Sequence, residues 1–314
     1  MSIRQSCFVA VLFFASLTSA YAQSVMPAPA PPIIGSKSYL VIDAQTGHEI
    51  AALDPDTPLP PASLTKLMTT YVVFKALAQG QVSLEDEVTI SEKAWRTPGS
   101  RMFVEVGKRV SIDDLLHGVI IQSGNDASVA LAEHVAGTEA AFASLMNHFA
   151  AQLGMDGTHF MNSTGLPDPE HYTTARDVAV LSLATIRDFP DFYAWYSEKE
   201  FTFNGIRQHN RNTLLWRDPA IDGLKTGHTE SAGYCLAASA KRDGMRLISE
   251  GALRETRTAQ IAMAPGADYG MGWMLDLAPH PDYESNGWIY LVHTHICRTC
   301  ADDGGETMLT RTMS

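Results

Sequence analysis

The 314-residue chain is poor in charged residues, and in basic residues above all. Charged side chains make up 18% of the sequence, and 23 lysines and arginines against 35 acidic residues give a formal net charge of −12. Proteins that bind nucleic acids normally carry a clustered basic surface, so this balance argues against a nucleic-acid partner. The hydrophobic fraction of 45% is that of an ordinary globular protein, and the length allows one large domain or two smaller ones.

Cysteine is also scarce, with four in the whole sequence, and Cys7 lies in the N-terminal apolar run. The remaining Cys235, Cys297 and Cys300 are an odd number and indicate no disulfide framework. Cys235 falls in a predicted strand, where we expect a small buried apolar side chain. The histidines and cysteines from His293 to Cys300 are of types that bind zinc, but no second ligand pair lies at the spacing of a structural site. We therefore expect no metal and no cofactor.

Long hydrophobic segments are absent except near the N-terminus. The apolar run 7–17 is too short to span a bilayer, but it follows the positive Arg4 and precedes the small-residue sequence Ala20-Tyr21-Ala22. This pattern predicts a signal peptide over residues 1–22, and the absence of a cysteine after it argues against a lipoprotein. We expect export to the periplasm, or to the outer face of the inner membrane. A lead segment rich in proline and alanine follows at 23–35.

Residues 36–249 carry strand-like segments at both ends and helix-like segments between them. The predicted strands are 38–43, 48–53, 87–90, 101–104, 201–203, 212–216, 223–228, 233–238 and 245–249, with a hairpin turn at Asp243-Gly244. The predicted helices are 63–78, 111–121, 126–135, 138–153 and 173–189. This order favours an α+β fold, in which helices flank an antiparallel sheet and also form an all-helical subdomain. The N-terminal and C-terminal strands are expected to lie side by side.

A serine and a lysine stand three residues apart where a proline-rich segment turns into a helix. Residues at this spacing share one helical face, so the Ser63 hydroxyl and the Lys66 amine are expected to meet. The first turn of a helix also offers unpaired N–H groups and the positive end of the helix dipole. A nucleophile, a base and a place to stabilise negative charge can therefore come from this one turn.

Two further motifs follow in order, Ser123-Gly124-Asn125 and Lys225-Thr226-Gly227. Taken alone, the three motifs are compatible with a helix cap, a loop between helices and a β-bulge. In this order they form the combination found in β-lactamases and penicillin-binding proteins. Residues 38–249 resemble a serine-type D-Ala-D-Ala carboxypeptidase, one of the low-molecular-mass penicillin-binding proteins, in segments 61–69, 123–127, 162–166, 172–177 and 222–229.

The resemblance implies a β-lactamase/transpeptidase-like fold and an acyl-enzyme on Ser63. Its substrates would be peptidoglycan stem peptides ending in D-Ala-D-Ala, and β-lactams would be covalent inhibitors. Lys66 is the candidate base if burial and a second cation lower its pKa, and Lys225 is the candidate for that cation. Ser123 would relay a proton to the leaving amine, and Asn125 would hold the substrate and Lys66.

The third motif would bind the substrate. Lys225 and Thr226 would meet the terminal carboxylate, and Gly227 would let the substrate lie along the strand. By resemblance, the backbone N–H groups of Ser63 and His228 would form the oxyanion hole. Arg211 is a further candidate for the carboxylate, although a solvated loop arginine is an equal alternative.

Three other activities fit parts of this pattern. A class A β-lactamase also needs a glutamate in a Glu-x-x-Leu-Asn stretch between the second and third motifs, and Glu170-His171-Tyr172-Thr173-Thr174 does not match it. A murein D,D-endopeptidase of the same superfamily remains an alternative. A non-catalytic peptidoglycan-binding relative is a third, against which the intact motif lysines and serine count.

The resemblance ends after Ser249, where the family continues an apolar strand and this chain has Glu250-Gly251-Ala252. We therefore expect the sheet's last strand to be incomplete. Residues 250–314 show neither clear alternation nor a cationic amphipathic helix, and we expect a divergent tail without a confident domain. Association with a membrane surface is left open, because no C-terminal amphipathic anchor is evident.

Overall fold

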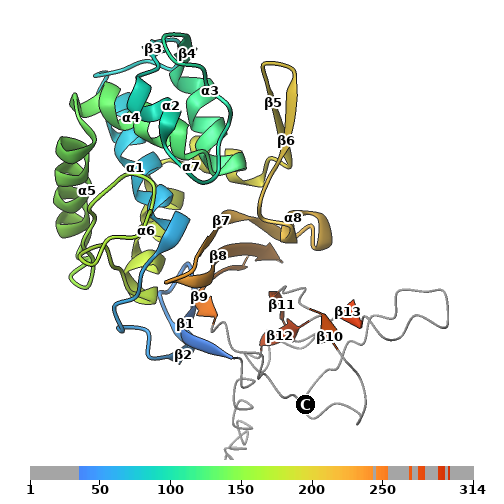
Figure 1. The fold of residues 1–314 in the computed structure, drawn as a ribbon. Coiled ribbons are helices and arrows are strands. Elements are labelled where there is room, and N and C mark those ends of the chain that lie inside the picture. The colour runs from blue at the N-terminus through green and yellow to red at the C-terminus, as the bar shows by residue number, and fades with distance from the viewer. Residues whose placement is uncertain are drawn as a thin grey trace, which may run out of the picture.

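The computed structural model describes residues 35–242 and 245–253, together with the short backbone segments 269–270, 275–279, 289–293 and 296–297. An antiparallel sheet lies below a lobe made mainly of helices (Figure 1). The α+β class expected from the sequence is confirmed. The predicted signal peptide, the lead segment up to residue 34, the turn at Asp243-Gly244 and most of the tail lie outside the described residues.

Five strands form the main sheet in the order β2-β1-β9-β8-β7. They are β1 (Ser36–Asp43), β2 (Glu49–Leu53), β7 (Ile221–Thr229), β8 (Gly233–Arg242) and β9 (Met245–Leu253). All neighbouring pairs are antiparallel. The first and last of these strands in the chain, β1 and β9, are paired, as the sequence predicts.

The expectation of an incomplete last strand is wrong. Strand β9 continues to Leu253 and pairs with β1 along its length, from Asp43 opposite Leu247 to Ser36 opposite Leu253. Backbone hydrogen bonds do not require apolar side chains, so Glu250-Gly251-Ala252 can continue the ladder between β1 and β8. The sheet therefore has its inner strand.

Eight helices and three shorter helical turns are labelled in the described part of the chain. The longer helices are α1 (Thr65–Ala78), α4 (Asn125–Ala136), α5 (Glu139–Leu153) and α6 (Ala175–Asp188). The shorter ones are α2 (Glu92–Arg96), α3 (Ile112–His117), α7 (Pro190–Tyr193), α8 (Leu214–Arg217), η1 (Ala62–Leu64), η2 (Gly118–Gln122) and η3 (Ala194–Ser197). Two small two-stranded sheets, β3 (Glu87–Thr89) with β4 (Arg109–Ser111) and β5 (Glu200–Phe203) with β6 (Ile206–His209), complete the lobe.

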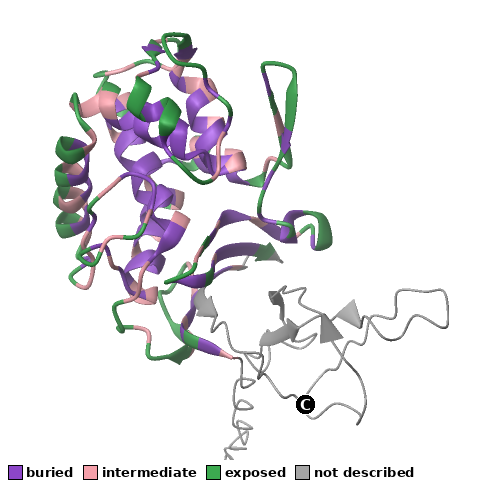
Figure 2. Ribbon diagram, viewed as in Figure 1, coloured by how far each residue is buried: buried purple, intermediate pink, exposed green. Residues whose placement is uncertain are grey.

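Helix α1 runs through the core of the lobe, and Figure 2 shows it buried over most of its length. Its buried side chains include Leu67, Met68 and Phe74, all fully covered. Helix α6 packs on the inner face of the sheet, where Ala179 meets Ile248 in one apolar cluster. Ser63, in the turn just before α1, therefore lies between the helical core and the sheet.

Two predicted strands are wrong. Residues 101–104 are irregular, because the Asp126 carboxylate accepts from the backbone N–H groups of residues 102–104, which are then not free for a strand partner. Residues 212–216 turn into α8, because the side-chain oxygen of Asn212 accepts from the Leu214 N–H and starts a helical turn. Helix α1 also begins at Thr65, two residues later than predicted, and Ser63 lies in the preceding turn η1.

The tail contributes two separate pairs of short strands in its described segments: β10 (Tyr269–Gly270) with β13 (Ile296–Cys297), and β11 (Leu275–Pro279) with β12 (Ile289–His293). That residues 250–314 are a divergent tail without a recognisable domain stays a prediction. Within the described ranges, no helix is both long and apolar enough to cross a membrane.

Candidate active site

The nucleophile candidate lies in a tight turn between two prolines and a helix. Ser63 is half-buried in η1, and the preceding Ala62 has a φ of +47°, which is rare for a residue with a side chain. The Thr65 N–H donates to the carbonyls of Ala62 and Ser63, which joins the turn to α1. The backbone thereby fixes the direction of the Ser63 side chain.

Lys66 is the centre of the polar contacts in the site. Its Nζ donates to Ser63 Oγ at 3.0 Å, to Asn125 Oδ1 at 2.7 Å and to the Thr164 carbonyl at 2.6 Å. The side chain is only 1% exposed. Three donors meet three acceptors, so the ammonium has a fixed place and points one hydrogen at Ser63 Oγ.

Burial lowers the pKa of Lys66 well below the ordinary lysine value, and the positive charge of Lys225 lowers it further. The negative charge of Asp126 acts in the opposite direction and raises this pKa. A lowered pKa increases the fraction of the amine that is neutral at a given pH. The neutral amine can then take the proton of Ser63 Oγ.

The second motif brings a serine and an asparagine to the same place. Ser123 ends η2 in the left-handed conformation, with a φ of +65°, and α4 starts two residues later at Asn125. The Ser123 hydroxyl is buried and has no hydrogen-bond partner among the described residues. Asn125 donates from Nδ2 to the Pro98 carbonyl at 2.6 Å, which turns Oδ1 toward Lys66.

Asp126 supports this motif and was not singled out in the sequence. Its carboxylate accepts from the backbone N–H groups of Met102, Phe103 and Val104 at 3.0, 3.0 and 3.3 Å. Phe103 has a φ of +70° in this arrangement. The signal available in the sequence is an acid in the first turn of a helix, a position that usually satisfies nearby N–H groups.

Strand β7, at the edge of the sheet, carries the third motif along the turn η1. Lys225 is 2% exposed and donates to the Thr226 carbonyl at 3.0 Å. Burial and the charge of Arg211 lower the pKa of Lys225 to about 7. Thr226 is half-buried, and His228 is exposed with its ring against Tyr234 at a centroid distance of 4.2 Å.

Arg211 is exposed, and its backbone N–H donates to the Ile121 carbonyl at 3.2 Å. Its charge reaches Lys225, so the two cations lie near one another at this side of the site. Two like charges, one buried and one solvated, form a suitable place for a carboxylate. A contact of Arg211 with substrate stays a prediction.

The loop 162–166 forms one wall of the site. Its contact with Lys66 was not predicted from the sequence. Its Thr164 carbonyl accepts from the amine, and its Gly165 presses on the nucleophile's turn. A β-carbon at residue 165 would lie 1.7 Å from the Ala62 carbonyl oxygen. A backbone carbonyl leaves no mark on residue type, which is why the Thr164 contact could not be read from the sequence.

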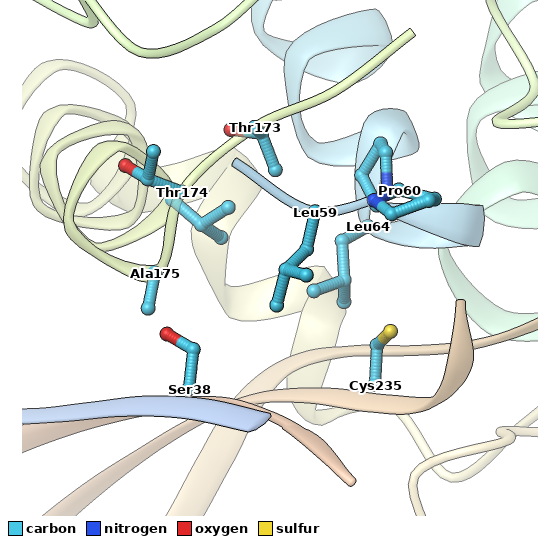
Figure 3. A pocket seen from close by; sticks show the side chains of 10 residues that line it. Ser38, Leu59, Pro60, Leu64, Thr173, Thr174, Ala175 and Cys235 are labelled. Atoms are coloured by element: carbon cyan, nitrogen blue, oxygen red, sulfur yellow. The ribbon is translucent and has the colours of Figure 1, made fainter. Parts of the chain in front are cut away.

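A cavity of about 30 Å³ lies behind the turn η1, between the start of α6 and the sheet (Figure 3). Leu59 and Leu64 line it from one side, and Ser38 and Cys235 line it from the sheet. Cys235 is 5% exposed and belongs to the apolar core, as expected from the sequence. In the described ranges, no group of three His, Cys, Asp or Glu side chains is placed to share a metal ion.

Comparison with known proteins gives the family. The sequence profile described as D-alanyl-D-alanine carboxypeptidase, of the peptidase S11 type, matches residues 25–250. This chain belongs to that family. The match covers the three motifs, the loop 162–166 and all but the last residues of β9.

Named relatives agree with the family. D-alanyl-D-alanine carboxypeptidase DacA of Haemophilus influenzae is 47% identical over 249 residues, which are 78% of this chain and 62% of that protein. The crystal structure of penicillin-binding protein 5 from Haemophilus influenzae is 48% identical and superposes with a TM-score of 0.69, covering 71% of this chain and 66% of that chain.

A third similar structure contains a β-lactam. Penicillin-binding protein D2 from Listeria monocytogenes in the ampicillin-bound form is 30% identical, with a TM-score of 0.66, covering 72% of this chain and 92% of that chain. The present chain spans about three fifths of the length of the curated relatives it matches first.

Proposed function

We propose that this chain is a serine D-alanyl-D-alanine carboxypeptidase that removes the terminal D-Ala from peptidoglycan pentapeptide stems. The observation that carries the proposal is the contact of Lys66 Nζ with Ser63 Oγ, at 3.0 Å, within a buried group of fixed acceptors. A poor nucleophile and a base with a lowered pKa stand in direct contact. Membership of the family supports the same reaction.

Acylation would proceed in one sequence of bond changes. Ser63 Oγ attacks the carbonyl carbon of the D-Ala-D-Ala bond and gives its proton to neutral Lys66. The C–N bond then breaks, and the departing amine receives a proton through the buried Ser123 hydroxyl, which has no partner among the described residues. The products are an acyl-enzyme on Ser63 and D-alanine, and water hydrolyses the ester in a second step.

The carbonyl oxygen becomes negative during the attack and needs donors. Strand β7 runs beside the Ser63 N–H, because Gly227 brings its backbone next to that nitrogen. The N–H groups of Ser63 and His228 are the proposed oxyanion hole. One such donor typically contributes about 10²–10³ in rate.

The substrate carboxylate would bind at the cationic side of the site. Lys225 is the buried cation there, Thr226 supplies a hydroxyl, and Arg211 adds charge from the solvent side. The substrate backbone would add to the free edge of β7, next to Gly227. Asn125 would hold the substrate from the opposite wall while its Oδ1 stays on Lys66.

β-Lactams would acylate the same serine, and water would hydrolyse the resulting acyl-enzyme slowly. A class A β-lactamase activates its deacylating water with a glutamate, whereas here the wall that contacts Lys66 presents the Thr164 carbonyl. Glu170, which begins the segment compared above with the Glu-x-x-Leu-Asn motif of these β-lactamases, is exposed. We therefore expect inhibition by β-lactams and not their turnover.

Labelling by a fluorescent penicillin tests the nucleophile. The purified protein is expected to form a covalent adduct that Ser63→Ala abolishes, while the exposed serine variant Ser144→Ala labels as the wild type does. Equal labelling of Ser63→Ala and the wild type would refute the assignment. An unlabelled wild-type protein that is folded would favour the non-catalytic peptidoglycan-binding alternative.

Two substrates separate carboxypeptidase from murein D,D-endopeptidase activity. Release of D-alanine from a pentapeptide, with little cleavage of cross-linked dimers, is the result expected here. The reverse preference would assign the endopeptidase reaction to the same serine. Either reaction requires export, and the proposed signal peptide 1–22 is tested by sequencing the N-terminus of the mature protein in a periplasmic extract.

A further inference from the structure

One imidazole ring joins the loop 161–171 to the start of α1. His171 is 3% exposed, and its Nε2 lies 2.8 Å from Thr65 Oγ1. Its Nδ1 accepts from the Met161 backbone N–H at 3.1 Å. Thr65 is the first residue of α1 and stands between Ser63 and Lys66 in the chain. The ring therefore bridges the loop that supplies the Thr164 carbonyl and the helix that carries Lys66. Both of its nitrogens are used in this bridge, and neither is bonded to Lys66.

The hydrogen bonds fix the protonation of this ring. A backbone N–H can only donate, so Nδ1 must be the bare nitrogen facing Met161. The proton of the neutral ring is then on Nε2, which donates it to Thr65 Oγ1. A doubly protonated ring would turn an N–H toward the Met161 N–H and lose that bond.

The parts that the ring joins have little freedom to adjust. Thr69 Oγ1 donates to the Ser163 carbonyl at 2.6 Å, and Lys66 Nζ donates to the next carbonyl, of Thr164, at the same distance. Gly165 follows directly and has no room for a β-carbon against the Ala62 carbonyl. A shift of the loop relative to α1 would therefore move the Thr164 carbonyl off Lys66 or push the turn that holds Ser63.

We propose that His171 is a positioning residue for acylation, which acts by clamping the Thr164 carbonyl and the first turn of α1 at the distance that aims Lys66 Nζ at Ser63 Oγ. The inference rests on the proposed function, because Lys66 must serve as the base for the aim of its amine to matter. His171 itself touches neither the nucleophile nor the base.

The electrostatics keep the clamp neutral while Lys66 works. Burial lowers the pKa of His171 to about 4. Asp168 raises this pKa, and the charges of His159 and Lys66 lower it. Phe160 covers the ring edge-on, with centroids 5.7 Å apart. At neutral pH, well above this pKa of about 4, the ring is thus neutral, with its proton on Nε2.

Nitrogen NMR of the full chain tests the clamp directly. The imidazole of His171 is expected to show a bare Nδ1 and a protonated Nε2 from neutral pH down to about pH 5, above its pKa of about 4. A ring with its proton on Nδ1, or a ring that titrates near the ordinary histidine value, would overturn the inference. This measurement needs no enzymatic activity.

Two variants test the effect on acylation. His171→Gln places an amide NH₂ and a carbonyl oxygen where the two ring nitrogens were, whereas His171→Phe keeps the ring and removes both hydrogen bonds. Misplacement of a reacting group by about 1 Å can cost about 100-fold in rate. We expect His171→Phe to slow the first-order acylation step by about 10- to 100-fold without weakening the initial noncovalent complex, and His171→Gln to recover most of the rate.

The matched control is His148→Gln, at an exposed histidine on α5, which is expected to change nothing. His171→Phe acylating at the wild-type rate would refute the proposal. So would equal losses in both His171 variants, which would indicate a need for the imidazole ring as packing. A wild-type protein that is not labelled at all would refute the proposed function instead, and the NMR experiment would still decide whether the ring bridges the two segments.

Thr65→Val is a second test, and on its own it should slow the first-order acylation step as His171→Phe does, so it decides the question even if the phenylalanine variant does not fold. It removes only the hydroxyl that receives the Nε2 proton. If His171 acts through Thr65, the double variant with His171→Phe is expected to be no slower than the slower single variant. Fully multiplicative losses would contradict a shared mechanism.

Discussion

Gly227 lies so close to Ser63 that a β-carbon on the glycine would stand 2.9 Å from the serine's backbone nitrogen. The same β-carbon would lie 3.1 Å from Ala62 Cβ and 3.3 Å from the Leu64 nitrogen. All three contacts are tighter than ordinary van der Waals contact, and two of them are to backbone atoms. Strand β7 and the turn that holds Ser63 can therefore pack this closely only because residue 227 has no side chain.

Gly227→Ala should separate the strand from the turn and spoil the proposed oxyanion hole. We expect acylation by penicillin to fall by about 10²–10³, the typical cost of one lost oxyanion donor. Overpacking should also lower the free energy of unfolding by about 1–3 kcal/mol. Labelling kinetics and denaturant unfolding measure the two effects.

Gly47→Ala is the control for a glycine substitution as such. Gly47 has a φ of +71°, and a β-carbon there meets nothing within 4 Å. It should cost about 1 kcal/mol of stability through backbone strain and leave the labelling rate unchanged. Normal labelling by Gly227→Ala would show that this close contact is not needed for the reaction.

The pH dependence of acylation should follow Lys66. Only the neutral amine of Lys66 can accept the serine proton. The rate should therefore rise as the pH passes the lowered pKa of Lys66 and then level off. The charge of Asp126 raises this pKa, so Asp126→Asn should move the rising limb to lower pH. Labelling rates across the pH range measure the shift.

The same variant should be less stable, because an amide NH₂ would face backbone N–H groups that now donate to the carboxylate. A cost of about 1–3 kcal/mol is expected for buried donors left unpaired. Glu133→Gln, at an acid that accepts from the Ser91 hydroxyl, is the comparison for removal of one negative charge. A limb that moves to higher pH in Asp126→Asn would contradict the assigned base.

Lys225→Met should stabilise the protein and weaken substrate binding. The pKa of Lys225 is about 7 in the folded protein and 10.5 for an ordinary lysine, so between these values the unfolded chain binds one more proton than the folded chain. The contribution of Lys225 to the free energy of unfolding therefore rises with pH between these two pKa values and is lowest below pH 7. Replacing the amine with an apolar side chain of similar length removes the cost of burying the charge.

Thermal unfolding of the wild type and Lys225→Met at several pH values tests this. The gain in stability should be largest at or below pH 7 and shrink toward alkaline pH. Lys108→Met, at an exposed lysine, should show no such trend. The KM for a peptide with a terminal carboxylate should rise in Lys225→Met; an unchanged KM would remove Lys225 from the carboxylate site.

Truncation should distinguish the sheet from the tail. A chain ending at Leu253 retains the whole of β9 and should unfold as cooperatively as the full chain. A chain ending at Arg246 loses nearly all of the strand between β1 and β8, and its exposed edges should make it aggregate. If the chain ending at Leu253 failed to fold, residues 254–314 would be shown to be part of the domain.

The sequence predicted the contact between Ser63 and Lys66, which the structure shows at 3.0 Å. Their spacing of three residues was enough to bring the two side chains together, although Ser63 lies in η1 and Lys66 in α1. Contacts made by backbone atoms left no such trace, as with the Thr164 carbonyl on Lys66. His171 was passed over because nothing near it in sequence marks Thr65 and Met161 as its partners.

Errors in the predicted elements arose because residue type does not show which hydrogen bonds the backbone makes. Apolar residues such as Leu214 and Leu215 suggested a strand, but the side chain of Asn212 turned the chain into α8. The β9 strand was cut short for the opposite reason. Its Glu250 and Gly251 look unlike a buried strand, yet its neighbours on both sides supply the hydrogen bonds that define one.

The pairing of β1 with β9 also constrains how the chain folds. Ser36 opposes Leu253, so the first and last strands of the sheet must find each other across nearly the whole described domain. Contacts of such wide sequence separation are slow to form, because a long loop must close before they stabilise anything. Helices α1 to α6 can form and pack earlier, so the turn that holds Ser63 would acquire its wall on β7 only in a late step. A chain that had not yet placed its final strand would thus leave that turn without the sheet beside it.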